Sequence, residues 1–66
     1  MTINFHKNIY PLKAIKDTVQ AYDGFAVFKI TDKCEYYVLM LSNIKKGVED
    51  TIKDEFCNYV LSRIKP

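Results

Sequence analysis

The longest helical pattern in the chain lies in residues 47–64. Apolar side chains recur there at steps of three and four residues, which is the spacing of one face of an α-helix. Polar and charged side chains fill the other face, so this pattern predicts an amphipathic helix packed on a sheet or another helix. Acidic residues stand near its start and basic Arg63 and Lys65 near its end, the order that the helix dipole favours. The apolar positions are Val48, Ile52, Phe56, Tyr59, Val60 and Ile64.

A shorter amphipathic helix is predicted between residues 11 and 22. Pro11 suits the first turn of a helix, because its fixed backbone angle is helical and its missing N–H is not needed there. Leu12, Ile15 and Val19 then fall on one face. Gly24 follows, and glycine readily adopts the left-handed conformation found just beyond a helix end.

Residues 2–6 alternate between polar and apolar side chains, the two-residue period of a β-strand. Ile3 and Phe5 would face one side of the strand, and Thr2, Asn4 and His6 the other. The pattern therefore predicts a short edge strand.

Two further strands are predicted in residues 25–30 and 34–41, which are rich in aromatic and branched side chains. The polar link 31–33 between them is short, so they should form an antiparallel hairpin. Apolar side chains occupy both faces of the second of these strands, so neither face has the polar side chains expected of a solvent-exposed face. Helices can cover one face, which leaves the other to be covered by something else.

The predicted order is strand, helix, strand, strand, helix in one α+β domain that spans residues 1–66. A right-handed crossover from the first strand to the second leaves room for the third strand between them. The expected fold is a three-stranded antiparallel sheet in order 1-3-2 with both helices on one face, a ferredoxin-like fold without its final strand. The first strand then has an open edge that can pair with another chain by β-augmentation, or with a second copy.

Composition supports a folded core and suggests a partner. The chain has 66 residues, 48% of them apolar, with five tyrosines and four phenylalanines. A domain of this size buries only about 60% of the surface that its unfolded chain exposes. We expect the remaining apolar surface to be covered by a partner or in a homodimer.

Charge and hydropathy narrow the function classes. The net charge is +2, and basic and acidic residues are mixed along the chain, without the basic stripe that nucleic acid requires. A nucleic-acid module that uses the strand aromatics and lysines is thus only a minor alternative. The sequence shows neither a signal peptide nor a run of apolar residues of membrane-spanning length, so we expect a cytoplasmic protein without a membrane partner.

The residues that could perform chemistry are scattered. His6 is the single histidine, and Cys34 and Cys57 lie far apart in sequence, outside any zinc or C-x-x-C spacing. We expect two free, partly buried thiols, with a disulfide as the alternative if a strand and a helix bring them together. The acidic residues of the last helix fit its dipole better than an acid and base pair. The two glycines belong to no phosphate-binding motif. We therefore expect no cofactor, no metal and no catalysis by this chain alone.

Tyr10 before a short helix, the hairpin 25–41 and the segment 55–61 together resemble HxsD-type proteins of the His-Xaa-Ser peptide-modification system. Proteins of this type accompany radical S-adenosylmethionine maturases that act on ribosomally made peptides. The resemblance implies an accessory protein that binds the precursor peptide or its modifying enzyme. It implies binding roles for Glu55, Asn58 and Arg63, and places the radical chemistry in the partner.

Two binding hypotheses follow. In the favoured one, a non-enzymatic module offers its open edge and the uncovered sheet face to a peptide or protein. In the other, two copies use that edge or face to form a homodimer. The residues expected at the edge are Ile3, Asn4, Phe5 and His6.

Overall fold

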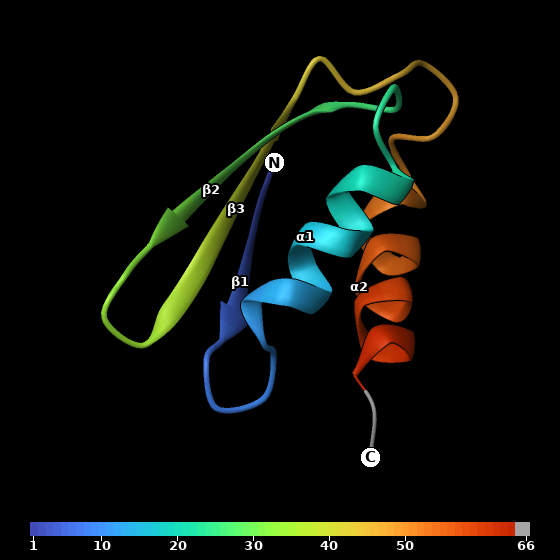
Figure 1. The fold of residues 1–66 in the computed structure, drawn as a ribbon. Helices are drawn as coiled ribbons and strands as arrows, with labels where there is room; N and C mark the ends of the chain where they lie inside the picture. Colours follow the sequence, from blue (N-terminus) through green and yellow to red (C-terminus); the bar gives the residue numbers. More distant parts are fainter. Residues whose placement is uncertain (65–66) are drawn as a thin grey trace.

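The computed structural model describes residues 1–64, which form three strands and two helices (Figure 1). Their order is strand, helix, strand, strand, helix, as the sequence predicts. The elements are β1 (Thr2–His6), α1 (Leu12–Ala21), β2 (Val27–Asp32), β3 (Tyr36–Ser42) and α2 (Ile52–Arg63). Helix α1 lies within the predicted span 11–22, with Pro11 as its N-cap.

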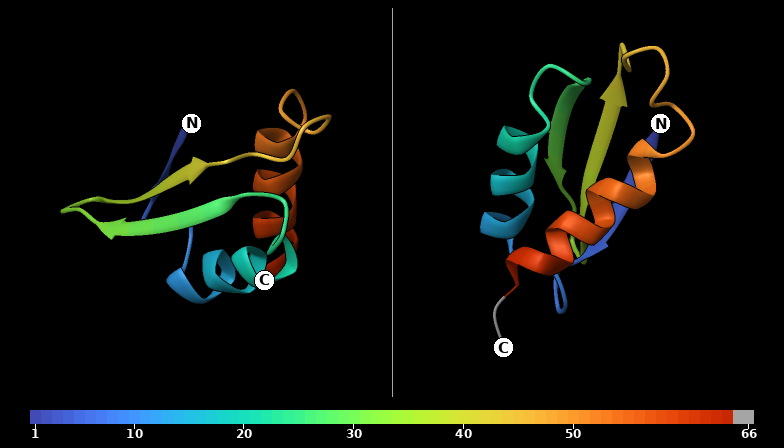
Figure 2. Two further views of the ribbon diagram at one scale, coloured as in Figure 1. Left: turned by 90° about the horizontal axis from the view of Figure 1, so that it is seen from above. Right: turned by 90° about the vertical axis from the view of Figure 1, so that its right-hand side faces the viewer.

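The strands form an antiparallel sheet in the order β1-β3-β2, with β3 in the centre. Ile3 of β1 and Ile30 of β2 both pair with Leu39 of β3, which fixes the register across the sheet. Both helices lie on one face of the sheet (Figure 2). The predicted topology, a ferredoxin-like arrangement that lacks its last strand, is thus confirmed.

The hairpin is shifted by two residues from its predicted position. Strand β2 ends at Asp32, and its last residues, Thr31 and Asp32, continue the pairing with β3 where a turn was expected. The turn is formed by residues 33–35, and the N–H of Lys33 donates to the carbonyl of Tyr36 at 2.8 Å. The prediction was wrong because polar residues such as Thr31 and Asp32 fit a strand when a partner strand supplies their hydrogen bonds.

Helix α2 begins later than residue 47, where its pattern starts. Gly47 has a φ of +99°, a left-handed conformation that a helix cannot contain. Val48 still packs against the core, and a turn in which Thr51 N–H donates to Val48 C=O (3.2 Å) leads into the helix. Arg63 stands in the last turn as predicted, whereas Lys65 lies outside the described residues.

The core lies between the sheet and the helices, and Phe56 of α2 is at its centre. Its ring lies 6.1 Å from Phe5, 5.4 Å from Phe28 and 5.6 Å from Tyr22, so one side chain joins β1, β2 and the end of α1. Thr18 is the buried polar residue, and its hydroxyl donates to the carbonyl of Ala14 at 2.8 Å. The buried apolar residues are Ile3, Phe5, Ala14, Ile15, Leu39, Leu41, Ile52, Phe56 and Val60.

Candidate functional site

The outer edge of β1, like that of β2, pairs with no other strand within residues 1–64. Met1 exchanges two hydrogen bonds with Leu41 of β3 (2.8 and 3.1 Å), and the N–H of Lys7 donates to the carbonyl of Glu35 at 3.0 Å. In an antiparallel pair, alternate residues point their backbone groups at the same neighbour. Residues 1, 3 and 5 therefore bond to β3, and Lys7 bonds to the turn just before it. The backbone groups of Thr2, Asn4 and His6 point away from the sheet.

This open edge ends at His6. The carbonyl of His6 accepts hydrogen bonds from the N–H groups of Ile9 and Tyr10, at 3.0 and 2.9 Å. Its Nδ1 atom accepts another from the N–H of Asn8 at 3.2 Å. The turn after β1 thus occupies the last acceptors of the strand. The N–H and C=O groups of Thr2 and Asn4 and the N–H of His6 are left for an incoming strand.

The four residues predicted for the edge contribute in different ways. Ile3 and Phe5 are 4% and 1% exposed, so their side chains belong to the core and cannot contact a partner. Asn4 is exposed, and His6 is half-buried with its ring 5.1 Å from that of Tyr36. Thr2 was missed, although its place two residues before Asn4 in the alternating pattern already indicates that both point the same way.

The face of the sheet away from the helices is partly apolar. Val27 and Met40, which alternate with the buried positions of β2 and β3, are 54% and 49% exposed. Of the described strand residues on this face, Lys29 is the one with a formal charge. The residues that share this face are Thr2, Asn4, His6, Val27, Lys29, Thr31, Tyr36, Val38, Met40 and Ser42.

The residues indicated by the family resemblance lie on α2, apart from the β1 edge. Glu55 and Asn58 are exposed. Glu55 lies one helical turn before Tyr59, whose ring is 5.8 Å from that of Tyr22, so Glu55 is on the side of α2 that faces α1. Burial raises the pKa of Tyr22, and the charge of Glu55 raises it further. Arg63 also turns toward α1 and lies 3.6 Å from the carboxylate of Asp17. The structure therefore brings Glu55 and Arg63 to the side of α1.

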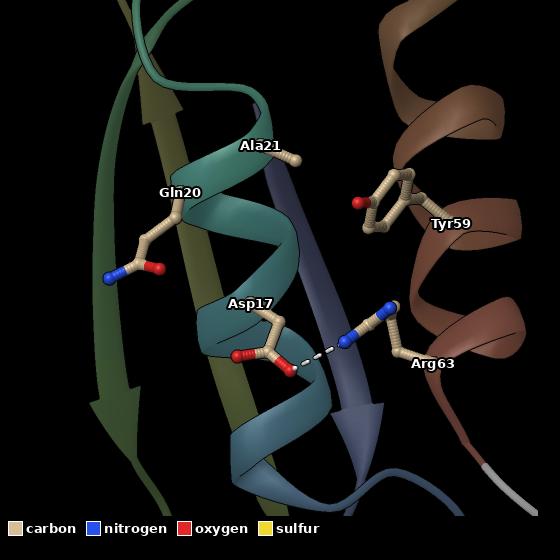
Figure 3. A pocket seen from close by; sticks show the side chains of 5 residues that line it. All are labelled: Asp17, Gln20, Ala21, Tyr59 and Arg63. Atoms are coloured by element: carbon tan, nitrogen blue, oxygen red, sulfur yellow. Dashed lines mark ion pairs between the residues drawn. The ribbon is translucent and has the colours of Figure 1, made fainter.

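Arg63 and Asp17 border a shallow groove between the two helices (Figure 3). Its volume is about 370 Å³, and Gln20, Ala21 and Tyr59 complete its lining. A hydrogen bond from Lys13 at 3.1 Å, with the nearby Arg63, lowers the pKa of Asp17. The charged residues that line the groove, Asp17 and Arg63, are thus paired with each other.

The two cysteine thiols lie on different elements of the fold. Both thiols are free, and Cys57 is half-buried on α2 as expected, whereas Cys34 is exposed because it lies in the turn of the hairpin. Burial raises the pKa of the Cys57 thiol, which makes it a poorer nucleophile at neutral pH. Within residues 1–64, no group of three potential metal ligands comes together.

No protein-family model, curated protein or solved structure matches this chain. Neither α1 nor α2 has the length and hydrophobicity that crossing a lipid bilayer requires.

Proposed function

We propose that this protein is a non-enzymatic accessory module that binds an extended segment of a peptide or protein along β1. The observation that carries the proposal is the unpaired edge of β1, where Thr2 and Asn4 direct their N–H and C=O groups outward. An extended peptide can satisfy these groups by adding a fourth strand to the sheet.

The composition of β1 supports this use. Exposed edge strands usually carry lysine, proline or a bulge, which prevent pairing with other chains. Residues 2–6 contain no proline and no lysine, and their register with β3 is unbroken. The open sheet face beside the edge adds apolar contact area through Met40 and Val38.

The resemblance to HxsD-type proteins suggests the partner. The bound segment would belong to a ribosomally made precursor peptide or to its radical S-adenosylmethionine maturase, and the partner would supply cofactor and chemistry. Glu55, Asn58 and Arg63 are the proposed contacts to a maturase, because a partner reaching them does not compete with the β1 edge. Two reduced thiols agree with a module that works in the cytoplasm.

A displayed library of random peptides tests the edge directly. Peptides selected against the wild-type protein are expected to bind Asn4→Ala normally and Asn4→Pro about tenfold or more weakly. Proline at this position removes an outward N–H and leaves the bonds to β3 intact. Circular dichroism of both variants verifies the fold. Equal binding to Asn4→Pro, or a library that yields no binder, would overturn the proposal.

Self-association through the same edge is the second candidate function. The alternation of β1, with Ile3 and Phe5 on the helix side and Thr2 and Asn4 on the other, matches that of a strand able to extend the sheet. Sedimentation equilibrium over a wide concentration range distinguishes the two. A dimer that Asn4→Pro dissociates supports self-association, and a monomer at all concentrations excludes it.

A further inference from the structure

The open edge of β1 has more hydrogen-bond donors than acceptors. Within residues 1–64, its outward backbone groups are the N–H and C=O of Thr2 and Asn4 and the N–H of His6. The carbonyl of His6 is not among them, because it already accepts from the N–H groups of Ile9 and Tyr10 at 3.0 and 2.9 Å. A carbonyl oxygen has two lone pairs, so this acceptor is fully used. The edge therefore offers three N–H groups and two C=O groups to a bound segment.

The side chain of His6 adds a further donor at the same end of the strand. Its Nδ1 atom accepts from the N–H of Asn8 at 3.2 Å, so the neutral ring carries its hydrogen on Nε2. Among the hydrogen bonds of residues 1–64, none uses that hydrogen. The ring is held 5.1 Å from that of Tyr36. At the level of His6, the edge thus presents donors alone.

The C-terminus of a chain matches an edge with an excess of donors. An interior residue of a bound strand brings one N–H for each C=O, whereas the terminal carboxylate only accepts. In a parallel pair, each β1 residue that points outward bonds to the two ligand residues on either side of its own level. The last ligand residue can then lie level with Phe5, donate its N–H to the carbonyl of Asn4 and accept from the N–H of His6. The preceding ligand residues bond to the other outward groups, so every group of the edge gains a partner.

We infer that the β1 edge binds the C-terminal segment of its partner, parallel to β1 and with the free carboxylate at His6. This inference rests on the proposed function and specifies which part of the partner is bound. Hydrogen bonds to a charged acceptor are roughly twice as strong as those between neutral groups. An antiparallel ligand would instead bring an N-terminal ammonium group or an interior N–H to His6, where the edge has no acceptor left.

The test uses a fluorescent peptide, KSVTVTV, in three forms. One form ends in a free carboxylate, one in an amide, and one continues for two glycines. The free carboxylate is expected to bind wild type about tenfold more tightly than either other form, because only it offers a charged acceptor without a further N–H. Equal binding of the three forms would overturn the inference.

His6→Pro and His6→Ala separate the backbone donor from the ring. Proline removes the outward N–H and keeps the carbonyl that accepts from the turn, whereas alanine removes the ring alone. The preference for the carboxylate should fall to within about twofold in His6→Pro and remain above about threefold in His6→Ala. Circular dichroism verifies both folds. An unchanged preference in a folded His6→Pro variant would contradict the role of this N–H.

Nuclear magnetic resonance of the wild-type protein measures the direction of the ligand and does not depend on any variant. A nitroxide on the first residue of the peptide should broaden the amide signal of Thr2 and leave that of Asn8 sharp. The amide signal of His6 should move further downfield with the carboxylate form than with the amide form. Broadening at Asn8 in place of Thr2 would show an antiparallel ligand and overturn the inference.

The outcomes also distinguish this inference from the proposed function. If the three forms bind wild type equally and all lose affinity in Asn4→Pro, the edge function stands and only the selection of a C-terminus fails. If none of the three binds, the inference fails, and the peptides selected from the displayed library decide the edge function by themselves.

Discussion

Leu39 and Met40 are neighbours on β3, yet Leu39 is 0% exposed beneath the helices and Met40 is 49% exposed on the other face. Both are large apolar side chains in the central strand. The difference arises from the helices, which cover one face of the sheet and leave the other open (Figure 2). Apolar side chains on the covered face hold the fold together, whereas those on the open face and edge are available for binding.

Of the variants that distinguish the two faces of the sheet, Leu39→Ala is expected to lower the stability of the fold most. Removing a fully buried leucine side chain leaves a cavity and lowers the free energy of unfolding by about 2–5 kcal/mol. The total free energy of unfolding of a domain of this size is roughly 3–10 kcal/mol, so the variant should be largely unfolded or close to it. Urea denaturation followed by circular dichroism measures the change.

Met40→Ala is its control on the open face. We expect a change within about 0.5 kcal/mol, because the side chain is already half in water. Similar losses in the two variants would contradict the assignment of the covered and open faces.

A second prediction separates the two sides of β1. The N–H of Ile3 points toward β3 and that of Asn4 points outward, so proline should be tolerated only at position 4. Ile3→Pro should be less stable than Ile3→Ala by about 1–3 kcal/mol, because a buried carbonyl of β3 loses its donor.

Asn4→Pro should differ from Asn4→Ala by no more than about 1 kcal/mol, because no bond within the sheet is lost. The same denaturation experiment applies to all four variants. A large loss in Asn4→Pro would place its N–H within the sheet and remove the open edge.

The rates at which a reagent modifies the two cysteine thiols should show which thiol is buried and which is exposed. Cys34 is exposed in the turn, whereas Cys57 is half-buried and burial raises the pKa of its thiol above 9.0. A thiol-specific reagent at mildly alkaline pH should modify Cys34 about tenfold faster, because only the thiolate reacts. Cys34→Ser and Cys57→Ala variants assign the two phases. Equal rates would contradict the partial burial of Cys57 on α2.

The smallest effect concerns Asp17 on the outer surface of the helix layer. Its hydrogen bond with Lys13 and its proximity to Arg63 lower its pKa below 3.8. A carboxylate whose pKa is lower in the folded state stabilises the protein above the unfolded value and loses this contribution as pH falls through the folded one. Stability should therefore decline slightly on acidification below 3.8, and less so in Asp17→Asn.

Urea midpoints from neutral pH downward measure this decline, with Asp50→Asn, an exposed carboxylate before α2, as the control. Identical pH profiles for wild type and Asp17→Asn would show that the ion pairs of Asp17 add nothing to stability.

Much of the fold could be predicted because local patterns agree with the tertiary structure. The two-residue alternation of 2–6 predicted β1, and the three- and four-residue spacing of Leu12, Ile15 and Val19 predicted α1. Boundaries were less predictable. Thr31 and Asp32 became strand residues through pairing with β3, and residues 49–51 form a turn ahead of α2 where the helical pattern had already begun.

The candidate site depended far more on tertiary structure. The alternation alone put Thr2, Asn4 and His6 on one side of β1, and the predicted topology exposed its edge. The sequence did not decide which face of β3 the helices cover, because both faces are apolar and periodicity cannot choose between them. Nor could it place Arg63 against Asp17, a pairing that exists only because α1 and α2 pack side by side. Short-range patterns thus determined the elements of this protein, whereas long-range packing decided which of its surfaces remain open for a partner.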